Sequence, residues 1–318
     1  MTKLKINEFP FYWRINNKIK NHPYIPAKLP YSFEIMKNTN LLIENRNQKL
    51  LSHLNRVYKE DSNIGFLRKG HSLAKGYGED FYKFLKNSLK FLKGKKILEI
   101  GCGAGRFTEY LAPLSSICVS IDLSSSIYYN VAINEKNLIL AKADFLQLIS
   151  KNKFDIVICR GVLQHTPNPM DSILKLYEFV NNEGLVFFDI YPMPKIGLLH
   201  PKYFFWRPLL TRIFTYENFE IFLKKNIVKL LFLKKILKLI FFNSNFFSDI
   251  FIPVWDYKGK IKLNNQQLND WAILDTLDGI FAKYDNPIRK KTLLKFLKNN
   301  NIQVLKKDLI NNIYKTKI

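Results

Sequence analysis

The sequence predicts an α/β protein whose centre is a doubly wound, mostly parallel sheet. Short apolar runs alternate with helical stretches from Lys95 to Pro192. Such alternation implies parallel strands joined by right-handed crossovers. A glycine-rich turn at residues 101–105 follows the first apolar run, and Asp122 follows the second. The composition, with 47% apolar and 24% charged residues among 318, is typical of a globular protein and excludes a disordered or disulfide-rich chain.

The first 90 residues are expected to form a helical and coiled extension. Aromatic and proline residues in its first third, such as Phe9-Pro10-Phe11, favour extended coil docked on the protein. We expect a helix over about residues 34–58 and a turn region over 63–71. Residues 79–91 carry Phe81, Phe84, Leu85 and Leu89 at helical spacing, which predicts an amphipathic helix.

Residues 91–192 carry the alternating pattern that defines the core. The expected strands are 97–100, 117–121, 138–140, 154–159 and 184–190. The expected helices are 106–111, a stretch after Ser124, 145–149 and 171–180. Asn168 as the N-cap and Pro169 at the first helical position suit the start of the last helix, and Asp171 lies in its positive first turn.

Beyond Pro192 the alternation stops and the chain becomes aromatic, apolar and basic. Helices are expected at residues 223–242, 268–281 and 289–297, with the last strands at 302–305 and 309–314. We therefore divide the chain into an N-terminal extension (1–90), a core (91–192), an inserted helical cap or substrate region (193–285) and a C-terminal return to the core (286–318).

The glycine-rich turn is the strongest chemical signal. A buried strand runs into Gly101, Gly103 and Gly105, where a backbone without Cβ atoms can turn tightly and let a ligand approach. Asp122 ends the next strand, 21 residues beyond Gly101, where a carboxylate can accept both hydroxyls of a ribose. A dinucleotide fingerprint would require a third glycine at position 106, which is Arg106. The spacing is instead Glu-x-Gly-x-Gly-x-Gly, beginning at Glu99.

This spacing resembles motif I of the class I (Rossmann-like) S-adenosylmethionine (SAM)-dependent methyltransferases. The resemblance covers about residues 90–192 in register, through Asp122, Ala143-Asp144-Phe145, Phe154-Asp155-Ile156-Val157, Leu163-Gln164-His165-Thr166-Pro167 and Asn182-Glu183-Gly184-Leu185. It implies a seven-stranded sheet, SAM as the cofactor and methyl transfer as the reaction. A weaker similarity over residues 271–287 points to larger methyltransferases that tailor sugars, lipids or surface glycans.

The resemblance also implies which residues hold the cofactor. Gly101, Gly103 and Gly105, with the adjacent Cys102, would line the amino-acid part of SAM, and Glu99 would lie at the base of the loop. Asp122, next to Leu123, would hold the ribose. Asp144 would meet the adenine amino group with Phe145 beside the ring, although Asp144 could instead cap the following helix and Phe145 could belong to the core. Arg160 and Gly161 would lie near the methionyl carboxylate or the methyl group.

His165 is the candidate catalytic base. It follows the fourth strand at the carboxyl edge of the sheet, where open α/β folds bind ligands, and histidine suits proton uptake near neutral pH. The alternative is that His165 only bonds backbone in the turn before Asn168. Six further residues are weaker candidates for substrate contacts, with core or capping roles as the alternative: Asp189, Tyr191, Asp275, Asp278, Tyr284 and Asp285. The histidines outside this region show no metal-ligand spacing, so no metal is expected.

The chain has a net charge of +24, but only nine of its 50 basic residues are arginine. This lysine bias favours a general basic surface over a nucleic-acid-reading one. In the helix 223–242, Leu230, Leu233, Leu237 and Ile240 share one side with several lysines opposite, so it either lies on an anionic membrane or covers an edge of the core. The oligomeric state is not predicted.

The leading hypothesis is SAM-dependent O- or C-methylation of a small molecule, sugar or lipid-linked acceptor. The alternatives are an RNA methyltransferase, or a SAM-binding subunit that has lost catalysis. Cysteine usage and the lack of a secretory signal or of a spanning apolar run predict a cytoplasmic protein, with peripheral membrane contact as an option.

Overall fold

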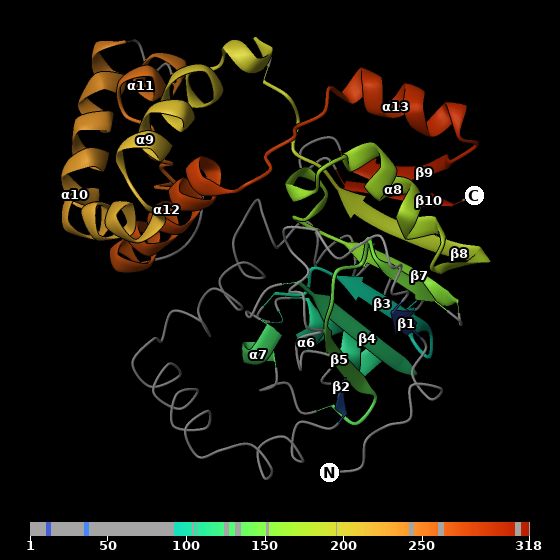
Figure 1. The fold of residues 1–318 in the computed structure, drawn as a ribbon. Coiled ribbons are helices and arrows are strands. Elements are labelled where there is room, and N and C mark those ends of the chain that lie inside the picture. The colour runs from blue at the N-terminus through green and yellow to red at the C-terminus, as the bar shows by residue number, and fades with distance from the viewer. Residues whose placement is uncertain are drawn as a thin grey trace, which may run out of the picture.

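The structure is a computed structural model. It describes residues 11–13, 35–37 and 92–317, apart from 104, 106, 124–126, 131–134, 151–152, 195, 242–244, 260–263 and 309–312. The expected turn over 63–71 and helix over 79–91 lie outside the described residues. Figure 1 shows a sheet with flanking helices and, to one side of it, a bundle of helices that we call the cap. Two chain segments join these parts.

One eight-stranded sheet forms the core, in the order β2-β5-β4-β3-β7-β8-β10-β9. Its five central strands are parallel, while β2, β10 and β9 pair antiparallel. In spatial order the strands are β2 (Ile35–Lys37), β5 (Leu138–Lys142), β4 (Ile117–Asp122), β3 (Lys96–Ile100), β7 (Phe154–Cys159), β8 (Val180–Asp189), β10 (Ile313–Lys317) and β9 (Gln303–Asp308). The predicted doubly wound, mostly parallel fold is confirmed, with seven strands from β5 to β9 and β2 added at the edge.

Both faces of the sheet are covered, which explains why its central strands are almost continuously apolar. One face packs against α8 (Pro169–Tyr177) and α13 (Lys290–Asn299), which contribute Ile173 and Leu297 to its core. The other face packs against α6 (Thr108–Leu111) and α7 (Ile127–Asn130), through Leu111 and Ile127. The first turn of α8 is as expected: the Asn168 side chain accepts hydrogen bonds from the amides of Met170 and Asp171.

Several predicted elements differ from the structure. No helix forms over 145–149; residues 145–147 are a turn, and β6 (Leu148–Ser150) pairs antiparallel with β1 (Phe11–Trp13). The expected helix over 34–58 is wrong at Ile35–Lys37, which forms β2, and its other residues lie outside the described part. Long-range strand pairing overrides local helical spacing in both places. The helix expected over 171–180 ends at Tyr177. The last described strand covers Ile313–Lys317, and residues 309–312 of the expected strand lie outside the described part.

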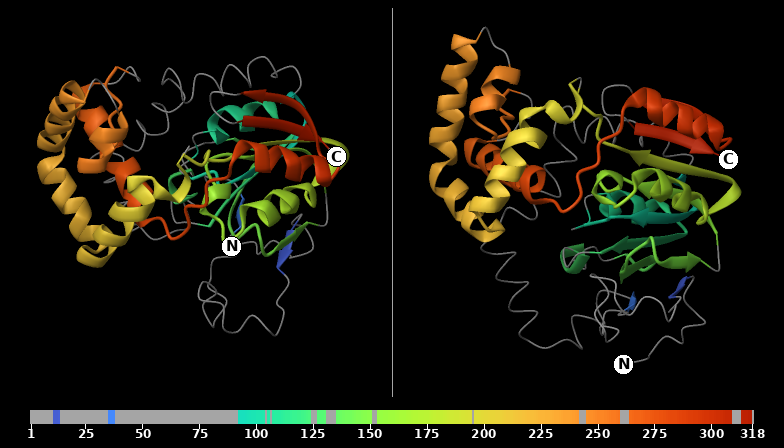
Figure 2. Two further views of the ribbon diagram at one scale, coloured as in Figure 1. Left: turned by 90° about the horizontal axis from the view of Figure 1, so that it is seen from above. Right: turned by 45° about the horizontal axis from the view of Figure 1, so that its top comes forward.

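The cap is a separate helical layer with its own apolar core. It contains α9 (Arg207–Ile213), α10 (Tyr216–Ile240), α11 (Asn245–Phe251) and α12 (Asn265–Phe281), preceded by short helical turns at Gly197–Leu199 and Lys202–Trp206. Figures 1 and 2 show these helices beside the sheet, with α10 at the outer edge. The chain leaves and re-enters the core side by side, because Pro192 and Ile288 form a parallel bridge. The boundaries of the cap, 192/193 and 285/286, remain a prediction.

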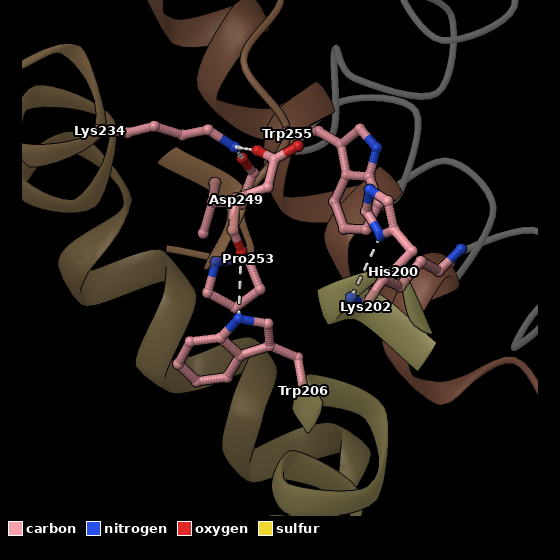
Figure 3. A pocket seen from close by; sticks show the side chains of 8 residues that line it. His200, Lys202, Trp206, Lys234, Asp249, Pro253 and Trp255 are labelled. Carbon is pink, nitrogen blue, oxygen red and sulfur yellow. Dashed lines mark hydrogen bonds and ion pairs between the residues drawn. The ribbon is translucent and has the colours of Figure 1, made fainter. Parts of the chain in front are cut away.

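The longest cap helix, α10, buries only part of the predicted face, because Leu230 and Leu237 pack against the core of the cap. Leu233 and Ile240 are exposed, whereas Lys234 lies in the interior with 5% of its side chain exposed. Its ammonium group pairs with Asp249 at 2.5 Å (Figure 3). The same group donates to the carbonyl oxygens of Ile252 and Val254. A buried charge requires such partners. The number of lysines in a helix does not show which of them has partners in the interior. Among the described residues, no helix is long and apolar enough to cross a membrane.

Candidate functional site

The candidate site lies at the carboxyl edge of the parallel strands, where the strand order reverses. From β3 the chain proceeds outward to β4 and β5, and then returns to the other side of β3 for β7 and β8. Open α/β sheets bind ligands in the crevice at this point. The ends of β3, β4, β7 and β8 bring Gly101, Asp122, Arg160 and Asp189 to one edge.

The glycine loop needs its glycines for backbone conformation. Gly101, Gly103 and Gly105 have φ angles of 74°, 52° and 95°, a region that other residues rarely adopt. The amides of Gly101 and Cys102 donate to the carbonyl oxygen of Ile121 at 2.8 and 3.1 Å, which fastens the loop to β4. Cys102 is buried in the apolar core of one sheet face, with 4% of its surface exposed.

Asp122 supports the glycine loop directly. Its Oδ2 accepts a hydrogen bond of 2.7 Å from the amide of Gly103. This bond joins the carboxylate at the end of β4 to the backbone that follows β3. The sequence predicted that these two groups lie in the same crevice. Leu123, the next residue, is exposed at the same edge.

The loop also packs tightly against the segment that follows β7. A Cβ atom on Gly101 would lie 2.0 Å from Cγ2 of Val162. Sequence reasoning missed Val162, because nothing in the pattern shows that residues 101 and 162 meet. Their contact follows from the direct pairing of β3 with β7.

Glu99 is a buried carboxyl group beneath the loop, with 1% of its surface exposed. Its Oε2 accepts hydrogen bonds from the hydroxyls of Thr108 at 2.6 Å and Ser120 at 2.7 Å, while Oε1 has no partner among the described residues. Burial raises the pKa of Glu99 to about 7, and the nearby Asp122 charge adds to the increase. The predicted position at the base of the loop therefore holds a carboxyl group whose ionisation opposes folding.

We expect Glu99→Gln to stabilise the protein above pH 7 and to have no effect near pH 4. The folded pKa of about 7 exceeds the ordinary value of 4.5, so stability is lost as pH rises through this window. At pH 8 the amide avoids that penalty, which amounts to at most about 3 kcal/mol of unfolding free energy. Urea unfolding at both pH values measures the gain, with Glu183→Gln, a carboxylate 92% exposed, as the control. Equal stability of Glu99→Gln and wild type at pH 8 would contradict the raised pKa of Glu99.

Arg160 is held by an acidic partner. Its Nε donates to Oδ2 of Asp189 at 2.6 Å, and Oδ1 of Asp189 accepts from the amide of Gly161 at the same distance. The guanidinium carbon lies 5.5 Å from the centre of the Phe107 ring. Because Asp189 already binds Arg160, the predicted contact of Arg160 with a ligand carboxylate remains a prediction.

The structure also places the residues predicted to meet the adenine. Oδ1 of Asp144 accepts a hydrogen bond of 3.0 Å from the amide of Leu146, which stabilises the turn that replaces the predicted helix. Phe145 is buried in the apolar core of one sheet face. Their adenine contacts remain predictions.

His165 lies where the core meets the cap. It ends a short helical turn, Leu163–His165, and its Nδ1 lies 2.9 Å from the carbonyl oxygen of Tyr284. Its Nε2 lies 3.5 Å from Oδ2 of Asp278, a residue of α12. The ring of Tyr191 meets the imidazole edge-on at 5.8 Å between centres. Three of the weaker candidates, Tyr191, Asp278 and Tyr284, thus gather around the candidate base.

Two hydrogen bonds from Asn286 hold this arrangement in place. The Asn286 amide donates to the carbonyl oxygen of Gln164, and its side chain donates to that of Thr166, both at 2.8 Å. These bonds tie the turn holding His165 to the segment that returns from the cap. Asn286 was not predicted, because its partners lie about 120 residues away.

The other two weaker candidates serve the cap. Asp285 pairs with Lys202, and Asp275 accepts hydrogen bonds from Tyr257 and, at 3.3 Å, from Trp271. Within the described ranges, no group of three or more histidine, cysteine or acidic side chains is arranged to hold a metal ion.

The comparison with protein families matches residues 98–188 to a methyltransferase domain. Among curated relatives, the ubiquinone biosynthesis O-methyltransferase of Glaesserella parasuis serovar 5 (strain SH0165) is 32% identical over 114 residues, which are 33% of this chain and 48% of that protein. The enzyme of that name from Coxiella burnetii (strain Dugway 5J108-111) is 31% identical over 103 residues, 31% of this chain and 44% of that protein. The chain thus spans about half the length of these relatives.

Solved structures give weaker matches. The N-methyltransferase NodS from Bradyrhizobium japonicum WM9, in complex with S-adenosyl-L-homocysteine, matches with a TM-score of 0.31 and 24% identity, covering 35% of this chain and 63% of that one. The magnesium protoporphyrin IX methyltransferase ChlM from Synechocystis PCC 6803 matches with a TM-score of 0.41 and 12% identity, covering 88% and 99%.

Proposed function

We propose that this chain, whose residues 98–188 are a methyltransferase domain of the class I type, transfers a methyl group from SAM to a small-molecule, sugar or lipid-linked acceptor. The observation that carries the proposal is the pairing of the glycine loop with Asp122 at the switch point of the sheet. The names of the curated relatives support methylation at oxygen, with carbon as the other option. The acceptor class rests on the domain match and on the lysine-rich, arginine-poor composition, which does not favour RNA.

The residues at the site fit such a cofactor. Gly101 and Gly103 are partly exposed and present bare backbone beside the half-buried carboxylate of Asp122. A carboxylate accepts at several positions, so one bond to Gly103 is compatible with its holding ribose hydroxyls. We assign Gly101, Cys102, Gly103 and Gly105 to the amino-acid part through their backbone, Asp122 to the ribose and Asp144 to the adenine. When bound, SAM supplies an electrophilic methyl group whose leaving group departs as a neutral thioether.

His165 is suited to take the proton of an acceptor hydroxyl or carbon acid. A hydrogen on Nδ1 donates to the carbonyl oxygen of Tyr284, which leaves the lone pair of the neutral ring on Nε2. As the new bond to the methyl carbon forms, the acceptor proton moves to Nε2. The resulting imidazolium lies 3.5 Å from the carboxylate of Asp278, which stabilises its charge. Asp278 is therefore a positioning residue supplied by the cap.

SAM is expected to raise the melting temperature by several degrees, and Asp122→Ala to remove most of this shift. A ligand that binds only the native state at a hundred times its Kd stabilises it by about 2.7 kcal/mol. Differential scanning fluorimetry with and without SAM measures the effect. Asp122→Asn separates the support of the glycine loop from the binding of the ribose, because it keeps an oxygen for the Gly103 amide but loses the charge. A full shift in Asp122→Ala would refute the ribose role of Asp122.

The reaction itself is tested by transfer of tritium from labelled SAM into a cell extract that is separated into RNA, lipid and small-molecule fractions. Label in the small-molecule or lipid fraction supports the proposal. Label in RNA would replace it with RNA methylation. SAM binding without transfer into any fraction would indicate a non-catalytic subunit.

A further inference from the structure

The cap helix α10 has two apolar faces on opposite sides. Its inner face, which includes Phe219, Leu223 and Ile227, packs into the core of the cap. A second set of apolar residues is exposed on the opposite side, and we call it the outer stripe: Ile221, Val228, Phe232, Ile236 and Leu239. Four of them follow one another at steps of seven, four and seven residues, which return to the same side of an α-helix, and Ile236 lies beside them.

The outer stripe faces solvent. Ile221 lies two residues after the buried Phe219, which is about 200° around the helix. The side chains of the stripe are between 37% and 66% exposed. Figures 1 and 2 show α10 at the edge of the cap remote from the sheet. The stripe is about 27 Å long at 1.5 Å per residue, and exposed apolar side chains gathered on one helix face favour an interaction site.

Lysine residues border the stripe. Lys224, Lys225, Lys229 and Lys235 are exposed along the same helix. The two acidic residues of α10, Glu217 and Glu220, lie in its first two turns, and Glu220 pairs with Lys224 at 2.7 Å. From Ile221 to Ile240 the helix carries no acidic residue, so the surface around the stripe is positive over most of its length.

The positive charge around the outer stripe indicates which kind of partner can bind there. A second copy of this chain would bring the same lysines face to face, at a net charge of +24 per chain. A bilayer with anionic headgroups instead offers apolar depth for the stripe and negative charge for its border. Lysine stems can extend along an apolar surface while the ammonium groups remain among the headgroups. We propose that α10 docks this protein onto an anionic lipid surface through the outer stripe, with the helix lying in the plane of the interface. This inference does not depend on methyl transfer.

Binding of the full chain to vesicles tests the proposal. Wild-type protein is expected to sediment with vesicles of phosphatidylcholine plus phosphatidylserine and to remain in the supernatant with phosphatidylcholine alone. Val228→Gln with Phe232→Gln is expected to lower the partition coefficient at least about tenfold. The exposed positions and the helix-compatible replacement leave folding intact, which circular dichroism and an unchanged SAM-induced thermal shift verify. Leu174→Gln, at an exposed position of α8, is the matched control.

A charge-matched pair separates the stripe from the overall positive charge. Lys229→Gln with Lys235→Gln should weaken binding by roughly tenfold or more, whereas Lys291→Gln with Lys295→Gln on α13, at exposed positions, should change it little. Equal losses in both pairs would overturn the proposal in favour of unspecific charge. Absence of wild-type binding, or full binding by the stripe variant, would overturn it as well. A smaller mass of the stripe variant in analytical ultracentrifugation, without an effect on vesicle binding, would identify a second copy as the occupant.

Discussion

Replacing His165 by alanine is expected to lower the rate of methyl transfer by about 10²–10⁴-fold, the usual contribution of a positioned general base. The reason is geometric: its Nδ1 is fixed by the carbonyl oxygen of Tyr284, and its Nε2 lies beside the carboxylate of Asp278. Initial rates of tritium transfer into the labelled acceptor fraction measure the loss. The SAM-induced shift in melting temperature should remain, because His165 is not among the residues assigned to the cofactor.

Two further variants separate a base from a structural role. Asp278→Asn keeps a similar shape but removes the charge that stabilises the imidazolium, so the rate should fall while the SAM-induced shift stays unchanged. His200→Ala, in the cap but outside this cluster, should leave the rate near that of wild type. If His165→Ala transfers methyl groups at the wild-type rate, proximity and alignment alone carry the reaction, and His165 serves only to join the core to the cap.

Gly101→Ala is expected to destabilise the protein by about 2–5 kcal/mol and to abolish the SAM-induced thermal shift. Its φ of 74° costs a residue with a Cβ atom about 1–2 kcal/mol. The added methyl group would also lie 2.0 Å from Cγ2 of Val162, and such overpacking typically costs about 1–3 kcal/mol. Relief requires the loop or Val162 to move, which displaces the backbone that we assign to the cofactor. Urea unfolding and fluorimetry with SAM measure the two effects.

Gly94 is a matched control for Gly101. Its φ is 72°, but nothing lies within 4 Å of a Cβ placed there. Gly94→Ala should therefore show only the backbone cost and keep the SAM-induced shift. Val162→Ala combined with Gly101→Ala should recover part of the packing cost, a coupling that a double-mutant cycle isolates. Equal destabilisation by Gly101→Ala and Gly94→Ala would show that the contact with Val162 is unimportant.

The candidate site divides into a part that the sequence predicted and a part that it did not. The glycine loop and Asp122 were predicted together because each follows a strand, and parallel strands end at one edge. The hydrogen bond from Gly103 to Asp122 agrees with this placement. Val162 and Asn286 were missed, because each meets its partner only through strand pairing or through the returning cap segment. The Arg160–Asp189 pair was missed for the same reason, although both residues had been named singly.

The sequence alone determined the doubly wound core, the order of its central strands along the chain, and a glycine-rich loop that shares one edge of the sheet with Asp122. These features depend on periodicity and on spacing of about 20 residues, which are local properties. Tertiary structure decided which distant groups meet: His165 and Tyr284 are 119 positions apart, and their contact exists only because the cap folds back on the sheet. It also decided which apolar face of α10 is buried and gave Lys234 its partners. A helix with apolar residues on two sides carries no internal signal of which side faces inward, since that depends on what packs against it.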